Sequence, residues 1–205
     1  GYVGPAVDET ALDVVMEGLA RLEYRGYDSA GVALIDGDGI AIRKRSGKLA
    51  NLRSEIGAHP VDPSTTAIGH TRWATHGGPT DNNAHPHLGG RDRKLALIHN
   101  GIIENFHRLK TSLVDLGHTF LSETDTEVAA HLVATAYEST GDLTEAMRAA
   151  VAQLEGAFTL LAIHADQPGV VVGARRNSPL VVGLGEGANY LGSDVAAFIG
   201  HTREA

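Results

Sequence analysis

The residues best suited to chemistry in this sequence lie in three short segments. They are His70-Thr71-Arg72-Trp73-Ala74-Thr75-His76-Gly77, His99-Asn100-Gly101 and Glu123-Thr124-Asp125-Thr126. The planar guanidinium of Arg72 matches an α-carboxylate in a bidentate way, and Asp125 accepts hydrogen bonds from an α-ammonium. These two charges together predict a clamp for a zwitterionic amino acid.

Asn100 and Gly101 indicate a different kind of chemistry. A side-chain amide beside a glycine, whose backbone N–H can closely approach a ligand, supplies suitable donors for the oxyanion of an acyl-transfer reaction. The attacking atom itself is missing from these segments, and the sequence contains no cysteine. Asn-Gly is also a strong hairpin signal, but residues 102–105 continue as the start of a helix rather than as a returning strand.

Both charged residues also have a structural interpretation. Arg72 could form an ion pair with a surface carboxylate, and an acid such as Asp125 in the first turn of a helix is favoured by the helix dipole in any protein. From their local context alone, therefore, ligand binding and a structural role both remain open.

Hydrophobic periodicity predicts the elements that would position these residues. An amphipathic helix is expected over residues 8–22 with Asp8 as its N-cap, followed by two short strands at 31–35 and 40–45 around a Gly/Asp turn. Further strands are expected at 67–74 and 94–99, so that Arg72 and Asn100 both lie at strand ends.

The second half of the chain continues with helices and then strands. A helix is expected over residues 103–116, ending at Gly117, and Thr124 and Glu127 have the spacing of a capping box before the next helix. A helix near 143–154 precedes strands at 157–163, 170–174, 180–182 and 188–191. Without a regular βαβ alternation, this order favours an α+β fold with antiparallel sheets.

Composition excludes several classes of protein. The 205 residues, of which 42% are hydrophobic and 20% charged, suit one soluble domain, and the net charge of −8 argues against a nucleic-acid surface. The basic run Arg43-Lys44-Arg45 is interpreted as a solvated strand face, and no apolar stretch is long enough for a membrane span. The absence of cysteine suits a reducing compartment, so we expect a cytoplasmic protein.

Two other motifs are interpreted as structural. His85-Pro86-His87 lacks the further ligands and spacing of a zinc site, so no metal and no cofactor are predicted. The segment 183–187, with three glycines, lacks the spacing of a phosphate-binding loop and is interpreted as a turn.

Five sequence blocks resemble the glutaminase domain of the glutamine:fructose-6-phosphate amidotransferase family, whose members are class II glutamine amidotransferases. The resemblance spans essentially the whole chain and rests on residues 22–31, 69–77, 83–87, 99–105 and 122–127. It implies the four-layer αββα sandwich of N-terminal-nucleophile hydrolases. Because family members begin with a Cys-Gly-Ile-Val-Gly-Tyr type of segment, we expect that this chain, beginning at Gly1, lacks about four residues including the nucleophile.

The resemblance also implies functional roles. Asn100 and Gly101 would form the oxyanion hole, whereas Arg72, Trp73, Thr75, His76 and Asp125 would bind the substrate. The expected ligand is L-glutamine or L-glutamate, and the expected partners are sugar isomerase domains of the same polypeptide, with neither nucleic acid nor membrane. The alternatives are a glutaminase domain of another class II amidotransferase and a non-catalytic module that binds an amino acid.

Overall fold

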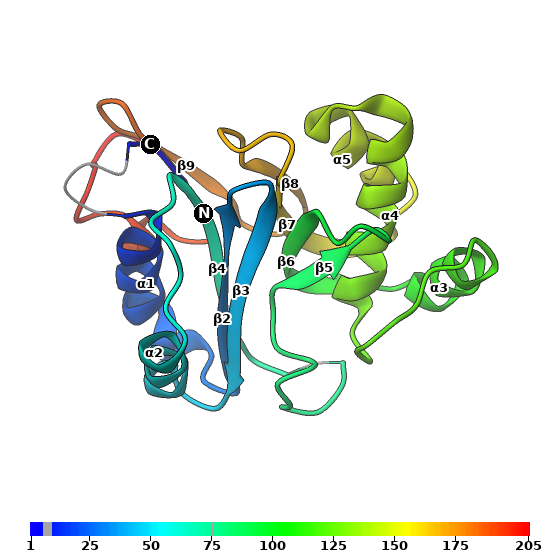
Figure 1. The fold of residues 1–205 in the computed structure, drawn as a ribbon, viewed down its shortest axis with the longest axis horizontal. Coiled ribbons are helices and arrows are strands. Elements are labelled where there is room, and N and C mark those ends of the chain that lie inside the picture. Colours follow the sequence, from blue (N-terminus) through cyan, green and yellow to red (C-terminus); the bar gives the residue numbers. More distant parts are fainter. Residues whose placement is uncertain (6–9, 75) are drawn as a thin grey trace.

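The chain folds into four layers, in which two β-sheets pack face to face between two layers of helices. A computed structural model describes residues 1–5, 10–74 and 76–205. Figure 1 shows the order of the layers: α1 and α2, the first sheet, the second sheet, and then α3, α4 and α5. The fold is therefore the αββα sandwich that the family resemblance implies, and its sheets are antiparallel as the order of elements predicts.

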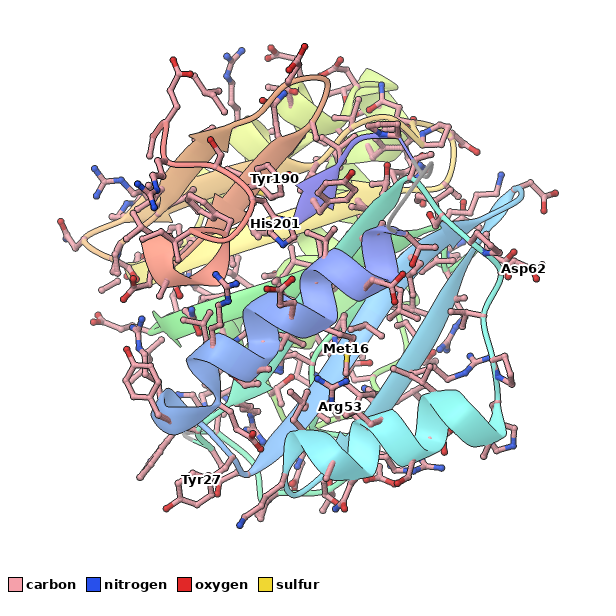
Figure 2. All side chains as sticks on the ribbon, turned by 90° about the vertical axis from the view of Figure 1, so that its left-hand side faces the viewer. Met16, Tyr27, Arg53, Asp62, Tyr190 and His201 are labelled. Carbon is pink, nitrogen blue, oxygen red and sulfur yellow. The ribbon has the colours of Figure 1, made fainter. Side chains whose placement is uncertain are left out.

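The first sheet has six strands, all paired in antiparallel fashion. Their spatial order is β3 (Gly39–Ser46), β2 (Ser29–Asp36), β4 (Thr66–Arg72), β1 (Tyr2–Val3), β10 (Asn189–Gly192) and β9 (Val181–Leu184). Helices α1 (Ala11–Leu22) and α2 (Leu49–Ala58) lie across its outer face, as Figure 2 shows. The two-residue strand β1 thus lies between β4 and β10, in the interior of the sheet.

The second sheet has four antiparallel strands in the order β5 (His87–Gly89), β6 (Leu95–Ile103), β7 (Gly156–His164) and β8 (Val172–Arg176). Helices α4 (Asp125–Thr140) and α5 (Leu143–Val151) cover its outer face, and α3 (Phe106–Asp115) packs on α4. Two short 3-10 turns, η1 (Glu23–Arg25) and η2 (Val195–Ala197), complete the described elements. No helix in the described part of the chain is long and apolar enough to cross a membrane.

Three apolar clusters hold the layers together. Between the sheets, Ile68 of β4 and the alternating residues Ala96 and Ile98 of β6 are buried in one cluster. Two larger clusters lie on the outer faces of the sheets, beneath the helices. A sheet buried on both faces produces the nearly continuous apolar runs seen in β2 and β7.

Two predicted boundaries are wrong. The first helix begins at Ala11 with Thr10 as its N-cap in a capping box with Asp13, whereas Asp8 lies outside the described residues. The helix expected from residue 103 begins at Phe106, because β6 continues through the Asn-Gly pair to Ile103. Pairing of this whole segment with β7, which sequence periodicity does not reveal, overrides the helical pattern.

The basic run on β3 is not the solvated strand face predicted from the sequence. Lys44 donates its three ammonium hydrogens to the carbonyls of Asn82, Ala84 and Pro86, and so anchors the segment between β4 and β5. Arg45 forms ion pairs with Glu55 and Asp81. These cations are structural because Lys44 is bonded to carbonyls of the segment that runs past β3, and Arg45 is paired with carboxylates of α2 and of that segment.

Other predictions are confirmed. Gly117 ends α3 at a φ of +87°, and the glycine-rich segment 183–187 comprises the end of β9 and most of the turn to β10. Thr124 caps α4 by accepting from the backbone N–H of Glu127. The Glu127 carboxylate, however, accepts from Leu121 and Ser122 instead of completing a capping box with Thr124. Helix α2 was not predicted from the sequence.

Candidate active site

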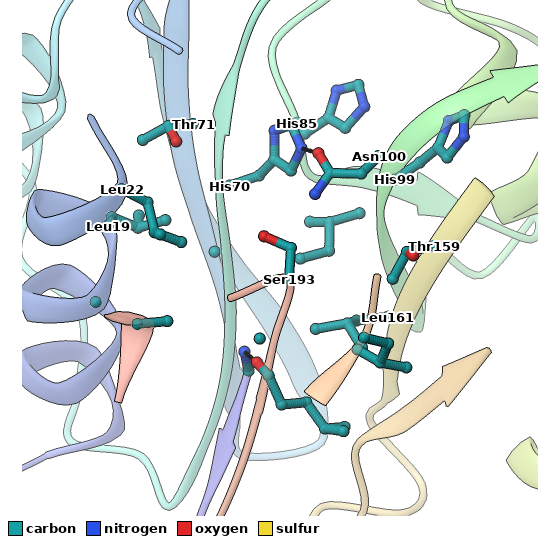
Figure 3. A pocket seen from close by; sticks show the side chains of 18 of the residues that line it. Leu19, Leu22, His70, Thr71, His85, His99, Asn100, Thr159, Leu161 and Ser193 are labelled. Atoms are coloured by element: carbon teal, nitrogen blue, oxygen red, sulfur yellow. Dashed lines mark hydrogen bonds between the residues drawn. The ribbon is translucent and has the colours of Figure 1, made fainter. Parts of the chain in front are cut away.

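A cavity of about 450 Å³ opens at the end of the sandwich where β4 and β6 finish. Its lining includes Arg72, Trp73, Asn100, Gly101 and Asp125, which come from two sheets and a helix. Figure 3 shows the part of the cavity around Asn100 and His70. The structure therefore brings together five of the seven site residues predicted from the sequence.

Arg72 ends strand β4 and is 4% exposed. Its guanidinium donates to the carbonyls of His76, Gly77 and Gly78, so it holds the loop that follows Trp73. Burial lowers the pKa of Arg72, and the negative charges of Asp125 and Asp28 oppose that shift. Arg72 is therefore a buried cation whose hydrogen-bond partners are neutral carbonyls. A carboxylate in their place would form stronger, charge-assisted hydrogen bonds with the guanidinium.

Asp125 is the first residue of α4 and is 3% exposed. Its Oδ2 accepts from the backbone N–H of Ile103 at 2.9 Å, and its Oδ1 lies 3.8 Å from Nδ1 of His99. One oxygen is therefore used to fix the carboxylate on β6. A second oxygen remains beside the cavity, where it can meet an ammonium group.

The side-chain amide of Asn100 reaches the cavity from strand β6. Its Oδ1 lies 2.8 Å from Nε2 of His70, which belongs to β4 of the facing sheet. Figure 3 shows the amide nitrogen of Asn100 directed away from His70 and into the cavity. A hydrogen-bond donor is thus presented to the cavity.

Gly101 occupies a position that only glycine fills without strain. Its φ is +121°, and a Cβ built there would lie 2.1 Å from the carbonyl oxygen of Ala157. The glycine therefore lets β6 continue beside β7 while its backbone borders the cavity. This is a close approach of two strands, and the hairpin turn considered from the sequence is not formed.

Trp73, His76 and Thr75 differ in their relation to the cavity. Trp73 lies at its rim, is 60% exposed and contacts Tyr27 edge to face with ring centroids 5.5 Å apart. The His76 ring packs on Phe106 instead of lining this cavity, although its carbonyl accepts from Arg72. Thr75 lies outside the described residues.

Three buried histidines, His70, His85 and His99, line the polar end of the cavity, and a fourth, His87, packs edge to face against His85 behind them. Burial lowers the pKa of each, to about 4 for His70 and His99. All four imidazoles are therefore neutral near pH 7, and the positively charged side chains of the cavity lining are those of Arg25 and Arg72.

His85 and His87, which the sequence analysis did not assign to a metal site, each contact a threonine hydroxyl. His85 Nε2 lies 2.8 Å from Thr126 Oγ1, and His87 Nε2 lies 3.1 Å from Thr124 Oγ1. Within the described residues, no group of three or more suitable side chains could hold a metal ion. These histidines therefore join the start of β5 and the segment before it to the start of α4.

His70 lines the cavity and contacts Asn100, and the sequence analysis assigned it no role. It precedes Arg72 by two positions on β4, and alternate residues of a strand share a face. This period-two relation was a usable signal. The contact with Asn100 was not, because it joins two strands of different sheets.

Fold and cavity define a domain of the N-terminal-nucleophile amidotransferase type. Residues 70–200 match the family described as the glutamine amidotransferase domain, and the chain belongs to this family. Among curated proteins, it is 64% identical over 205 residues to the glutamine–fructose-6-phosphate aminotransferase (isomerizing) of Streptomyces coelicolor. It is 53% identical over 210 residues to the protein of the same name from Mycobacterium tuberculosis.

Each of these alignments covers 100% of this chain but 33% of the relative, so the chain spans about a third of their length. Among solved structures, a glutamine phosphoribosylpyrophosphate amidotransferase from B. subtilis superposes with a TM-score of 0.79 at 28% identity. That superposition covers 98% of this chain and 43% of the other. The likeness extends over both sheets and their helices.

Proposed function

We propose that this chain is the glutaminase domain of a glutamine–fructose-6-phosphate aminotransferase, which hydrolyses L-glutamine to L-glutamate and ammonia. The observation that carries the proposal is one cavity bordered by a buried cation, a buried carboxylate and an amide donor, namely Arg72, Asp125 and Asn100. The first two fit the charges of an α-amino acid, and the third fits the oxygen of its side-chain amide. Identity to enzymes of that name supports the choice of reaction.

The nucleophile, in this proposal, is an N-terminal cysteine carried four residues ahead of Gly1. Strand β1 pairs with β4 through Tyr2 opposite Ala67, so each step back along the chain advances one residue along β4. In the same register, the fourth residue before Gly1 would lie opposite Arg72. The cavity follows this course, since it is bordered by β4 from Gly69 to Arg72 and by residues 191–193.

The environment of Gly1 supports a chain that continues along this course. Gly1 exchanges two hydrogen bonds with Leu191, as a residue inside an antiparallel ladder does. Burial lowers the pKa of its α-amine to about 5. A charged terminus is thus disfavoured here, whereas a neutral peptide N–H makes the same bond without carrying a charge into the sheet.

An N-terminal cysteine would carry its own base. The α-amine, with an intrinsic pKa of about 7.7–8.0, takes the thiol proton, and the thiolate attacks the side-chain carbonyl carbon of glutamine. The electron pair of the carbonyl moves to oxygen, and the resulting oxyanion is held by the Asn100 side chain and the backbone N–H of Gly101. No histidine is needed as the base, in keeping with the neutral, hydroxyl-bonded or amide-bonded histidines around the cavity.

The intermediate then collapses. The bond between the side-chain carbonyl carbon and its nitrogen breaks as the α-ammonium of the N-terminal cysteine returns its proton to that nitrogen. Ammonia leaves, and a glutamyl thioester forms. Water, deprotonated by the same amine, hydrolyses the thioester to glutamate and restores the thiol. Throughout both steps, Arg72 and Asp125 hold the α-carboxylate and the α-ammonium of the glutamyl group.

In the proposed whole protein, the ammonia passes to sugar isomerase domains of the same polypeptide, which convert fructose 6-phosphate into glucosamine 6-phosphate in the cytoplasm. The exposed ring of Trp73 at the rim of the cavity suits a gate over the reacting centre. We expect the domain alone to make glutamate but no glucosamine 6-phosphate.

Glutamate release from L-glutamine tests the proposal. The chain as printed should be inactive, and the same chain prefixed with Cys-Gly-Ile-Val and carrying a free α-amine should be active. A Ser-Gly-Ile-Val prefix should be far slower because a hydroxyl is a poorer nucleophile than a thiol near neutral pH. Acetylation of the terminal amine should also inhibit, since it removes the base.

Two results would contradict the assignment. Equal rates for the printed and the prefixed chain would show that the nucleophile lies elsewhere. No activity in either chain, with glutamine binding retained, would favour the non-catalytic module that binds an amino acid.

A further inference from the structure

Asn100 can serve as an oxyanion donor in only one of its two amide orientations. The oxygen and nitrogen of a side-chain amide have similar sizes, so a half-turn of the group exchanges an acceptor for a donor at nearly the same place. With its nitrogen toward the cavity, Asn100 attracts a negative oxygen. With its oxygen there, it repels one. Some neighbour must therefore set the orientation.

His70 is the neighbour that contacts the other end of the amide. Its Nε2 lies 2.8 Å from Oδ1 of Asn100, across the interface between β4 and β6. Figure 3 shows the consequence, with the amide oxygen toward His70 and the nitrogen toward the interior of the cavity. At 7% exposure, the imidazole is shielded from water that could compete for the amide.

The protonation state of His70 determines whether this contact is attractive. Burial lowers the pKa of His70 to about 4, so the ring is neutral near pH 7 and carries a single N–H. Its Nδ1 has no hydrogen-bond partner among the described residues. A proton on Nδ1 would leave a buried donor unsatisfied and would place two lone pairs 2.8 Å apart, whereas a proton on Nε2 is donated to Asn100.

The plane of the ring is also held. The His85 ring stacks on His70 with centroids 4.6 Å apart and planes 24° apart, and His85 Nε2 lies 2.8 Å from Thr126 Oγ1 of α4. Rotation of His70 about its ring bond is therefore opposed by packing. The donor on Nε2 thus has a fixed direction.

We propose that His70 is a positioning residue, which donates from Nε2 to the Asn100 oxygen and thereby holds the Asn100 NH2 group toward the oxyanion. The role rests on the proposed glutaminase function. His70 does not touch the reacting atoms, and it acts only through the orientation of the amide.

Three variants of the chain prefixed with Cys-Gly-Ile-Val test this role. His70→Phe keeps a planar ring against His85 but removes the donor, and kcat should fall about 10- to 100-fold, with KM for glutamine changed less than about threefold. The upper bound is the loss of one oxyanion donor, about 100- to 1000-fold. His70→Gln carries an amide nitrogen near the place of Nε2 and should recover at least about half of the lost activation free energy.

His164→Phe is a matched control, because His164 is 3% exposed, stacks on Tyr137 with planes 24° apart and does not line the cavity. Its kcat should match that of the parent chain.

A double-mutant comparison separates positioning from a general structural effect. In an Asn100→Ala background, His70→Phe should lower kcat by less than about twofold, because the group on which it acts is absent. Additive losses in the double variant would overturn the proposal. So would equal losses for His70→Phe and His164→Phe, because both would then reflect the removal of a buried imidazole.

A spectroscopic measurement separates this proposal from the proposed function. In protein with ¹⁵N-labelled histidine, the His70 resonances, assigned by their loss in His70→Phe, should show the proton on Nε2. The Nδ1–H form would overturn the proposal whatever the activity. If the prefixed chain released no glutamate, the glutaminase assignment would fail, and with it the role of His70 in catalysis, while the Nε2–H form would still establish the contact.

Discussion

The backbone N–H of Ile103 donates to Oδ2 of Asp125 at 2.9 Å, and this bond ties the end of β6 to the first turn of α4. The two oxygens of the Asp125 carboxylate therefore have different surroundings. One oxygen satisfies a backbone donor inside the protein, and the other lies beside the cavity. The acid predicted to bind an α-ammonium is therefore held in place by the same strand that carries Asn100.

These two roles of Asp125 can be separated by substitution. Asp125→Asn keeps an oxygen that can accept from Ile103 but removes the charge, so Tm should change little while the Kd for glutamate rises about 10- to 100-fold. Asp125→Ala leaves the Ile103 N–H unsatisfied and should in addition destabilise the fold by about 1–3 kcal/mol. Calorimetry gives the Kd, and urea unfolding gives the stability. Equal stability losses in the two variants would contradict the division of roles.

Arg72 should dominate recognition of the α-carboxylate. Arg72→Ala removes two parallel charge-assisted hydrogen bonds, which are together worth about 3 kcal/mol, so glutamate should bind about 100-fold more weakly. Titration calorimetry on the folded variant measures this. Arg148→Ala, which removes an exposed arginine paired with Glu145, is the control and should leave the Kd unchanged.

The same clamp should select for a zwitterion. Butyramide carries the amide of glutamine but neither charge, so it should not compete with glutamate at equal concentration. Equal binding of butyramide would remove Arg72 and Asp125 from the recognition of the ligand.

Local signals predicted much of this fold. The helices at α1, α4 and α5 and most strands follow from apolar periodicity, and Gly117 and Thr124 mark their helix ends by their own backbone requirements. Helix α2 was not predicted, although Leu49, Leu52 and Ile56 pack on the core at helical spacing, because only the first two are fully buried and the helix has no side-chain cap. Its position is fixed by packing on β2 and β3, which is not a local property.

Five of the residues that line the cavity were singled out from the sequence, but the contacts between them were not. Arg72, Asn100 and Asp125 were identified by their chemistry and by resemblance to a family. The contacts from His70 to Asn100 and from Asp125 to Ile103 join residues 30 and 22 positions apart. Because such contacts arise only when the two sheets and α4 assemble, no pattern within one segment could have indicated them.

Gly101 should be the least tolerant of the site glycines. Gly101→Ala places a Cβ at a φ of +121°, 2.1 Å from the Ala157 carbonyl oxygen, so β6 and β7 must separate. We expect a loss of about 2 kcal/mol or more in urea unfolding. Gly57→Ala is the control, because nothing lies within 4 Å of its Cβ and it occupies helix α2, where alanine should stabilise by about 0.5–1 kcal/mol.

The loop after Trp73 should respond to the ligand. Three consecutive carbonyls, at residues 76–78, accept from Arg72, and a bound α-carboxylate competes for the same guanidinium. We expect the loop to rearrange over the ligand and its amides to gain protection from hydrogen exchange on saturation with glutamate. The turn at 183–187 serves as an internal control. Unchanged exchange at 76–78 would exclude such a closure.

Acid should destabilise the domain through its buried histidines. The pKa of His70 and that of His99 are lowered by burial to about 4, from an unfolded value of 6.5, so protons bind more tightly to the unfolded chain. Stability is therefore complete above pH 6.5 and is lost as the pH falls toward 4. Between pH 7 and pH 5, each of these two histidines should cost about 2 kcal/mol.

Substitution of His70 isolates its contribution to the loss of stability between pH 7 and pH 5. From urea unfolding at pH 7 and pH 5, the parent chain should lose about 2 kcal/mol more than His70→Gln, because glutamine does not titrate. His70→Phe should give the same reduced pH dependence as His70→Gln, even though its stability at pH 7 differs, since both variants remove the same ionisation. If the free energy of unfolding changed equally with pH in the parent and in both variants, His70 would have the same pKa in the folded and unfolded states. That result would contradict the lowering of its pKa by burial.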